Sequence, residues 1–135
     1  MADISLENKT VLVTGAAGFI GSFLSKRLLE TYRGITVIGI DSITDYYDTS
    51  LKDERLSMLN SCGGKFTFIK GDIADKETLV SVFEKYNPDI VVNLAAQAGV
   101  RYSIDNPDAY IKSNMIGFYN ILECCRHHPV EHLVF

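Results

Sequence analysis

Tryptophan is absent from the 135 residues, and proline and cysteine occur only three times each. So little proline, in a chain that is 47% hydrophobic and 22% charged, excludes a disordered or fibrous segment and favours one folded domain. The cysteines Cys62, Cys124 and Cys125 contain no C-x-x-C pair and lack the spacing of zinc ligands. They predict neither a disulfide framework nor a metal site, and a reducing compartment, by default the cytoplasm.

Excess basic charge and long apolar runs are also lacking. The 13 basic and 17 acidic residues give a net charge of −4, which excludes the basic surface that nucleic-acid binding needs. The apolar stretch 90–100 is interrupted by Asn93 and Gln97, so it is too short for a membrane span. Residues 1–9 lack the basic start and apolar run of a secretory signal. We expect neither nucleic acid nor membrane as a partner.

Short β-branched or apolar runs alternate with segments of helical periodicity. Strands are expected at 10–14, 36–40, 66–70, 90–94 and from residue 132. Helices are expected from residue 19, at 51–59, from 75 to 86 and at 108–127. This alternation predicts an α/β fold, a doubly wound parallel sheet with helices on both faces. Because the chain stops within the fifth apolar run, we expect the domain to be truncated there.

Two of these helices carry an apolar stripe that is expected to face the sheet. In the first helix the stripe is Ile20, Phe23, Leu24 and Leu28. In the long helix it is Ile111, Met115, Phe118, Leu122 and Cys125.

Three glycines follow the first expected strand. Residues 14–21 read Thr-Gly-Ala-Ala-Gly-Phe-Ile-Gly. Gly15 can adopt the positive φ of a tight turn, Gly18 has no Cβ to keep a phosphate from the backbone, and Gly21 lets the helix approach the sheet. The start of the helix would then direct free amides at a pyrophosphate. The pattern predicts a dinucleotide-binding turn, and an ordinary strand-to-helix turn is the alternative.

Asp41 ends the second expected strand, 20 residues after Gly21. A carboxylate at this place accepts hydrogen bonds from the adenosine ribose hydroxyls and repels a 2′-phosphate, so NAD is favoured over NADP. The alternative is a solvated aspartate in a turn.

Four motifs occur in the order seen in extended short-chain dehydrogenase/reductases: 14–21, Asp41, Gly71-Asp72-Ile73 and Asn93-Leu94-Ala95-Ala96. Within that family the chain most resembles UDP-glucuronate 4-epimerases, through 45–48 (Asp-Tyr-Tyr-Asp), 50–52 (Ser-Leu-Lys) and 95–103. The dehydratase branch has an acidic residue and a histidine where Gln97 and Ala98 stand. The resemblance covers all but the first few residues and corresponds to the amino-terminal part of a typical member.

The resemblance implies a Rossmann fold with strand order 3-2-1-4-5 and NAD as cofactor. It places Asp72 at the adenine amino group, Ile73 against the ring and Asn114 beside the nicotinamide-end ribose. Asp72 as a turn residue and Asn114 as a structural amide are the alternatives. The full set of implied cofactor residues is Gly15, Ala17, Gly18, Phe19, Ile20, Gly21, Asp41, Asp72, Ile73, Leu94, Ala95, Ala96, Gln97 and Asn114.

Arg101 is the residue expected to bind substrate, because a guanidinium pairs well with a hexuronate carboxylate or a nucleotide phosphate. A surface ion pair is the alternative. The catalytic Tyr-x-x-x-Lys pair of the family is absent, since none of the seven tyrosines has a lysine four positions later. We therefore expect residues 1–135 to form an NAD-binding domain without catalytic residues and without the sugar-nucleotide domain.

For the intact enzyme, the resemblance implies C4 inversion of a UDP-hexuronate such as UDP-glucuronate, through a transient 4-keto sugar. A 4,6-dehydratase or decarboxylase of the same scaffold, or a dinucleotide-binding module without catalysis, are the alternatives. The resemblance also implies a homodimer through the helix at 108–127, with Tyr119, Ile121 and Cys124 as the second apolar face.

Two weaker groups remain. Tyr46 and Tyr47 either stack on adenosine or pack over their loop. The histidines His127, His128 and His132 lack metal-ligand spacing and are explained most simply as a solvated helix end.

Overall fold

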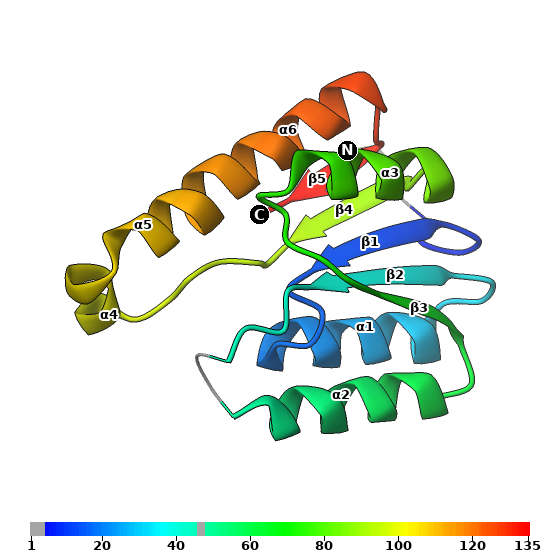
Figure 1. Ribbon diagram of the computed structural model, residues 1–135. Helices are drawn as coiled ribbons and strands as arrows, with labels where there is room; N and C mark the ends of the chain where they lie inside the picture. Colours follow the sequence, from blue (N-terminus) through cyan, green and yellow to red (C-terminus); the bar gives the residue numbers. More distant parts are fainter. Residues whose placement is uncertain (1–4, 46–47) are drawn as a thin grey trace.

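The computed structural model describes residues 5–45 and 48–135, so Tyr46 and Tyr47 lie outside the described residues. A five-stranded sheet runs through the centre in the order β3-β2-β1-β4-β5 (Figure 1). The strands are β1 (Thr10–Thr14), β2 (Thr36–Asp41), β3 (Lys65–Lys70), β4 (Ile90–Asn93) and β5 (His132–Val134). All neighbouring pairs are parallel, which confirms the predicted doubly wound sheet.

Helices cover both faces of the sheet. One face carries α1 (Phe19–Thr31) and α2 (Thr49–Ser61), and the other carries α3 (Lys76–Tyr86) and α6 (Phe118–His127) (Figure 1). Strand side chains alternate between the two layers: Leu12 packs with Phe83 and Ile121, whereas Val11 packs with Leu28 on the opposite face. The chain therefore builds one core on each side of the sheet.

The long helix starts close to the predicted residue and changes type along its length. It consists of α5 (Pro107–Tyr110), the π-helix η1 (Ile111–Gly117) and α6, and it is preceded by the short α4 (Val100–Asp105). Each π-turn takes up more residues than an α-turn, so the stripe that meets the sheet shifts along the sequence.

The predicted stripe of this helix was therefore wrong at three of its five residues, whereas Phe118 is half-buried and Cys125 packs against the core. Ile111, Met115 and Leu122 are exposed, whereas Ile121 and Cys124 lie in the core at 0% and 2% exposure. Ile121 and Cys124 consequently cannot form a dimer face, and of the three residues predicted for it only Tyr119 is exposed.

The stripe predicted for α1 was wrong at its amino-terminal end. Ile20 and Phe23 are exposed, and the helix instead buries small residues, Gly21, Ser22 and Ser25, together with Leu28. Small side chains are required because the first turn of α1 runs directly against the turn that follows β1. Periodicity records where apolar residues lie, but this close approach decides which face meets the sheet.

Two aspartates cap helices near the crevice. Asp48 accepts the Ser50 amide at the start of α2, and the predicted N-cap Asp75 accepts the Thr78 amide at the start of α3. Hydrogen bonds from Thr78, first from its side chain, lower the pKa of Asp75, and those from Ser50 lower the pKa of Asp48. Among the described helices, none has the length and apolar character needed to cross a bilayer.

Candidate functional site

A pocket of about 440 Å³ lies at the carboxyl ends of β1, β2, β3 and β4. In a doubly wound sheet this is the crevice where ligands bind, on either side of the strand at which the order reverses. Ten of the predicted cofactor residues line it: Gly15, Gly18, Phe19, Asp41, Asp72, Ile73, Leu94, Ala95, Ala96 and Gln97.

The glycine turn is shaped by two close approaches. Gly15 has a φ of 67°, and a Cβ there would lie 3.0 Å from the Ala95 amide nitrogen. A Cβ on Gly21 would lie 2.2 Å from the Gly15 carbonyl oxygen, so no larger residue fits without moving the turn. A Cβ on Gly18 would meet only that same oxygen, at 3.1 Å, and Gly18 lines the pocket. The turn is therefore packed on its inner side and bare toward the pocket.

The amino terminus of α1 meets this bare side. Gly18 is the N-cap and has no side chain with which to cap the helix. The amides of Phe19 and Ile20 stand in the first turn, where no carbonyl of a preceding turn is available. Free amides at the positive end of a helix dipole favour an anionic group such as a diphosphate.

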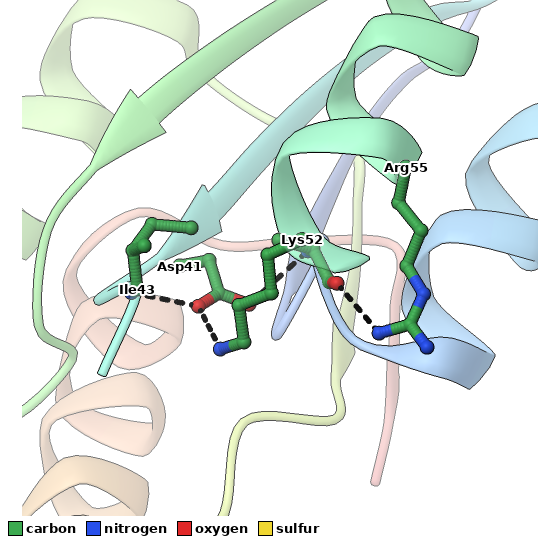
Figure 2. Close-up of polar contacts among 5 residues, drawn as sticks. Asp41, Ile43, Lys52 and Arg55 are labelled. Carbon is green, nitrogen blue, oxygen red and sulfur yellow. Dashed lines mark hydrogen bonds and ion pairs between the residues drawn. The ribbon is translucent and has the colours of Figure 1, made fainter. Parts of the chain in front are cut away.

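Asp41 lies beside the turn and is buried (Figure 2). Its Oδ2 accepts the Ala17 amide at 3.1 Å, and its Oδ1 accepts the Ile43 amide at 2.9 Å. The Lys52 ammonium donates to Oδ1 at 2.8 Å, forming an ion pair (Figure 2). Asp41 thus holds the glycine turn in place and still lines the pocket.

Sequence reasoning missed Lys52 and Arg55, which both line the pocket from α2. Arg55 donates to the Ala17 carbonyl at 3.3 Å (Figure 2). Its guanidinium lies 5.9 Å from the centre of the Phe19 ring. The sequence did contain one indication of them: Lys52 and Arg55 are three positions apart, which places both cations on one side of the helix that follows Asp41.

Asp72 lines the same pocket from the segment that follows β3. One oxygen accepts the Ala74 amide at 2.9 Å, and the other forms a 2.8 Å ion pair with Lys112 of η1. The hydrogen bond to Asp72 raises the pKa of Lys112. Ile73, next in the chain, is buried and also lines the pocket.

Thr14 was part of the predicted motif but had no role of its own. Its hydroxyl lies 2.6 Å from Asn93 Oδ1 and accepts the amides of Leu94 and Ala95, both at 3.0 Å. This buried side chain therefore joins the end of β1 to the segment that leaves β4.

Asn114 bonds to the chain itself. Its Oδ1 accepts the Gln97 amide at 2.8 Å, and its Nδ2 donates to the Gln97 carbonyl at 3.0 Å. The structural alternative for Asn114 therefore describes its contacts here. The pair ties η1 to the loop after β4.

The model of the GDP-mannose 4,6 dehydratase family matches residues 12–135. The chain belongs to this family. The matches also confirm the resemblance to NAD-dependent epimerases and dehydratases of the extended short-chain dehydrogenase/reductase type.

The chain is similar to several curated proteins, some of which carry epimerase names. It is 52% identical over 125 residues to Protein CapI of Staphylococcus aureus, covering 93% of this chain and 36% of that protein. It is 49% identical over 117 residues to UDP-glucuronate 4-epimerase 4 of Arabidopsis thaliana, covering 87% of this chain and 26% of that protein. The chain thus spans about a third of the length of these relatives.

A solved relative shows what this scaffold holds elsewhere. UDP-glucuronic acid 4-epimerase of Bacillus cereus, in complex with UDP-glucuronic acid and NAD, superposes with a TM-score of 0.80 at 32% identity, covering 92% of this chain and 38% of that one. Other epimerase structures in the comparison also contain NAD.

Five predicted site residues are not among the residues that line the pocket: Ala17, Ile20, Gly21, Asn114 and Arg101. The Ala17 amide is taken by Asp41, and Gly21 packs against Gly15. Arg101 is exposed on α4 and does not reach the crevice.

Within residues 5–45 and 48–135 no group of three or more His, Cys, Asp or Glu side chains has a metal-binding arrangement. Burial raises the pKa of the Cys125 thiol to about 11, so near neutral pH it is protonated and a poor nucleophile.

Proposed function

We propose that this chain is the NAD-binding part of a nucleotide-sugar 4-epimerase that acts on a UDP-hexuronate such as UDP-glucuronate. The observation that carries the proposal is the pocket itself. A glycine turn that is bare toward the pocket, free amides at the start of α1 and a carboxylate at the end of β2 meet within it. The relatives named above support the choice of reaction.

The residues present fit a dinucleotide. The amides of Phe19 and Ile20 would receive the diphosphate, and Asp41 would accept hydrogen bonds from the adenosine ribose. Asp72 would take the adenine amino group, with Ile73 against the ring. The backbone of 94–97 lines the rest of the crevice. When bound, NAD would supply a hydride acceptor that later returns the hydride to C4 of the sugar.

Adenosine binding would require the ion pair between Lys112 and Asp72 to rearrange. Lys112 already occupies one oxygen of Asp72, so an adenine amino group would replace or share that contact. The exposed Lys112 side chain is able to swing aside at little cost in burial.

Arg101 is proposed to bind the hexuronate carboxylate or a substrate phosphate. It is exposed and outside the pocket lining, so α4 would have to approach the substrate for this contact. A tyrosine base with a lysine four residues later is not among residues 1–135, and proton transfer is therefore not assigned to this chain.

A homodimer through the helix at 107–127 is also proposed. The apolar side chains on its outer side, Ile111, Met115, Ile116, Tyr119 and Leu122, are all exposed and replace the face predicted from sequence. A double substitution, Met115→Gln with Leu122→Gln, is expected to yield monomers in sedimentation equilibrium, whereas Leu51→Gln on exposed α2 should leave the dimer intact. A monomeric parent protein would contradict this.

One alternative is a 4,6-dehydratase or decarboxylase, favoured by the description of the matching family model. Against the dehydratase stand Gln97 and Ala98, where that branch has an acidic residue and a histidine. A dinucleotide-binding module without catalysis is the other alternative, because no catalytic tyrosine pair lies in the chain. The cysteine usage supports a cytoplasmic location for any of the three.

Calorimetric titration with NAD, followed by an assay of UDP-glucuronate for its C4 epimer, tests the proposal. Residues 1–135 alone are expected to bind NAD without turnover. The whole protein encoded by the gene is expected to convert UDP-glucuronate to UDP-galacturonate. A 4-keto-6-deoxy sugar or a pentose product would favour the dehydratase or decarboxylase. If neither residues 1–135 nor the whole protein binds NAD, the proposal is overturned.

A further inference from the structure

Asp41 does not present a bare carboxylate to the pocket. Its side chain is 5% exposed and that of Lys52 is 17% exposed, with 2.8 Å between Oδ1 and Nζ. The amides of Ala17 and Ile43 take further positions on the two oxygens. An ionised carboxylate offers about four acceptor positions, so about one remains for a ligand.

Lys52 has donors to spare. An ammonium group carries three N–H bonds, and one of them is directed to Asp41. Within residues 5–45 and 48–135, Asp41 is the only hydrogen-bond or ion-pair partner of Lys52. Both side chains line the pocket, so the free donors of one adjoin the free acceptor position of the other.

Arg55 adds a second cation one turn further along α2. It lines the same pocket and is held by the Ala17 carbonyl and the face of the Phe19 ring. Lys52 balances the charge of Asp41, and the exposed N-cap Asp48 lines the pocket together with Arg55, so the pocket has two cations and two anions on this side. The repulsion of a 2′-phosphate expected from Asp41 alone is therefore offset by the charges that surround it.

We propose that Lys52 is a second ribose-binding residue, which donates to the hydroxyl from which Asp41 accepts or to the hydroxyl beside it, and that Lys52 sets how strongly the site rejects a 2′-phosphate. The proposal rests on the proposed function, because it places the adenosine ribose at Asp41. A ribose hydroxyl is both a donor and an acceptor, and the carboxylate alone satisfies only the donor. With Lys52 present, discrimination between the two coenzymes is weaker than an isolated carboxylate would impose.

The test uses ADP-ribose and 2′-phospho-ADP-ribose as probes, since they carry the adenosine end without the nicotinamide. Their dissociation constants are measured by calorimetry for the protein its gene encodes and for Lys52→Met, Lys52→Arg and Arg55→Met. Lys26→Met, on the exposed side of α1, is the matched control. Thermal unfolding of each variant shows whether it is folded.

Lys52→Met is expected to weaken ADP-ribose about fivefold and 2′-phospho-ADP-ribose about fiftyfold, because the remaining carboxylate then faces the phosphate unbalanced. Lys52→Arg should keep the ratio of the two constants within about twofold of the parent, and Arg55→Met should change it less than Lys52→Met. Added salt should narrow the gap between the two probes in Lys52→Met.

An unchanged ratio in folded Lys52→Met overturns this inference and leaves the proposed function standing, provided that the parent protein binds ADP-ribose. If Lys52→Met does not fold, the ratio of the two dissociation constants in Lys52→Arg decides. This variant keeps the positive charge, so a more than tenfold change in that ratio, at an unchanged affinity for ADP-ribose, contradicts the role proposed for the charge. A parent protein that binds neither probe overturns the proposed function and this inference together.

Discussion

The two ends of the crevice are built differently. At the end where adenosine is proposed to bind (the adenosine end), Asp41 and Thr14 are buried, and their hydrogen bonds run to the backbone of the glycine turn and of the segment after β4. At the other end lies the segment from residue 96 to residue 112, whose first three residues line the pocket; most of its residues are exposed, and Asn114 holds it through a pair of bonds to Gln97. The first end is part of the core, while the second rests on a few exposed contacts.

This difference shows which half of the site the domain can organise alone. Groups whose position is fixed by the core bind a ligand without an ordering cost. The loop and η1 have few buried contacts, so their arrangement is the more easily changed. We therefore expect the adenosine and diphosphate contacts to be the most sensitive to substitution, and the outer segment to be tolerant.

Replacing Asp41 should have the largest effect. Asp41→Ala leaves Lys52 and the Ala17 and Ile43 amides without their acceptor, and we expect a loss of about 3 to 5 kcal/mol in the free energy of unfolding. The affinity for NAD should fall by about 1 to 3 kcal/mol. Urea unfolding and calorimetry measure the two quantities.

The exposed Asp53 on the same helix provides a matched control. Asp53→Ala should change neither quantity by more than about 0.5 kcal/mol. If Asp41→Ala behaves like Asp53→Ala, the adenosine end is not organised as described.

Gly21 tests the close packing of the turn. In Gly21→Val the new Cβ would collide with the Gly15 carbonyl, which should cost about 3 kcal/mol in urea unfolding. Gly18→Ala, with a Cβ facing the pocket, should fold with less than about 1 kcal/mol lost while binding NAD more weakly. Equal loss of stability in the two variants would contradict the distinction between the packed and the bare side of the turn.

The outer end is expected to respond less. Asn114→Ala removes both bonds to Gln97, and because the side chain is exposed we expect a loss of about 1 kcal/mol. Hydrogen exchange at the Gln97 amide should accelerate, whereas exchange in β1 should not. Asn60→Ala on exposed α2 is the control, and faster exchange throughout the sheet in Asn114→Ala would show that the two ends are not independent.

The smallest effect concerns the helix caps. The pKa of Asp75 is lowered in the folded chain, so its stabilising contribution is present above the unfolded value of 3.8 and is lost as the pH falls through the folded value. Asp75→Asn should therefore differ from the parent in urea midpoint at about pH 6 more than at about pH 3. A difference that grows on acidification would have the wrong sign for a lowered pKa.

The strands themselves and the glycine turn could be predicted because each depends on local chemistry, whereas the strand order came from the family resemblance. Apolar β-branched runs, an aspartate at a strand end and glycines at a turn need no distant partner to be identified. The buried faces of the helices could not be predicted in the same way. Gly21 faces the turn after β1, and Gly117 faces Ile73, where a Cβ would lie 2.6 Å from the Ile73 side chain. These approaches, and the π-turn in η1, are set by tertiary packing rather than by periodicity.

The carboxylates of the candidate site could be predicted from the sequence, but the lysines that pair with them could not. Asp41 stands at a strand end after the glycine turn, from which its proposed role follows, whereas the role proposed for Asp72 came from the family resemblance. Lys52 and Lys112 reach those carboxylates from helices that the sequence does not orient. The prediction of a carboxylate that repels a 2′-phosphate therefore omitted the ammonium group beside it.

The most direct test of the central claim is a crystal structure of the protein grown with NAD. We predict the diphosphate within hydrogen-bonding distance of the Phe19 and Ile20 amides and the adenosine ribose at Asp41. NAD bound elsewhere on the protein, or a crevice at the carboxyl ends of β1 and β4 that stays empty at saturating NAD, would contradict the account.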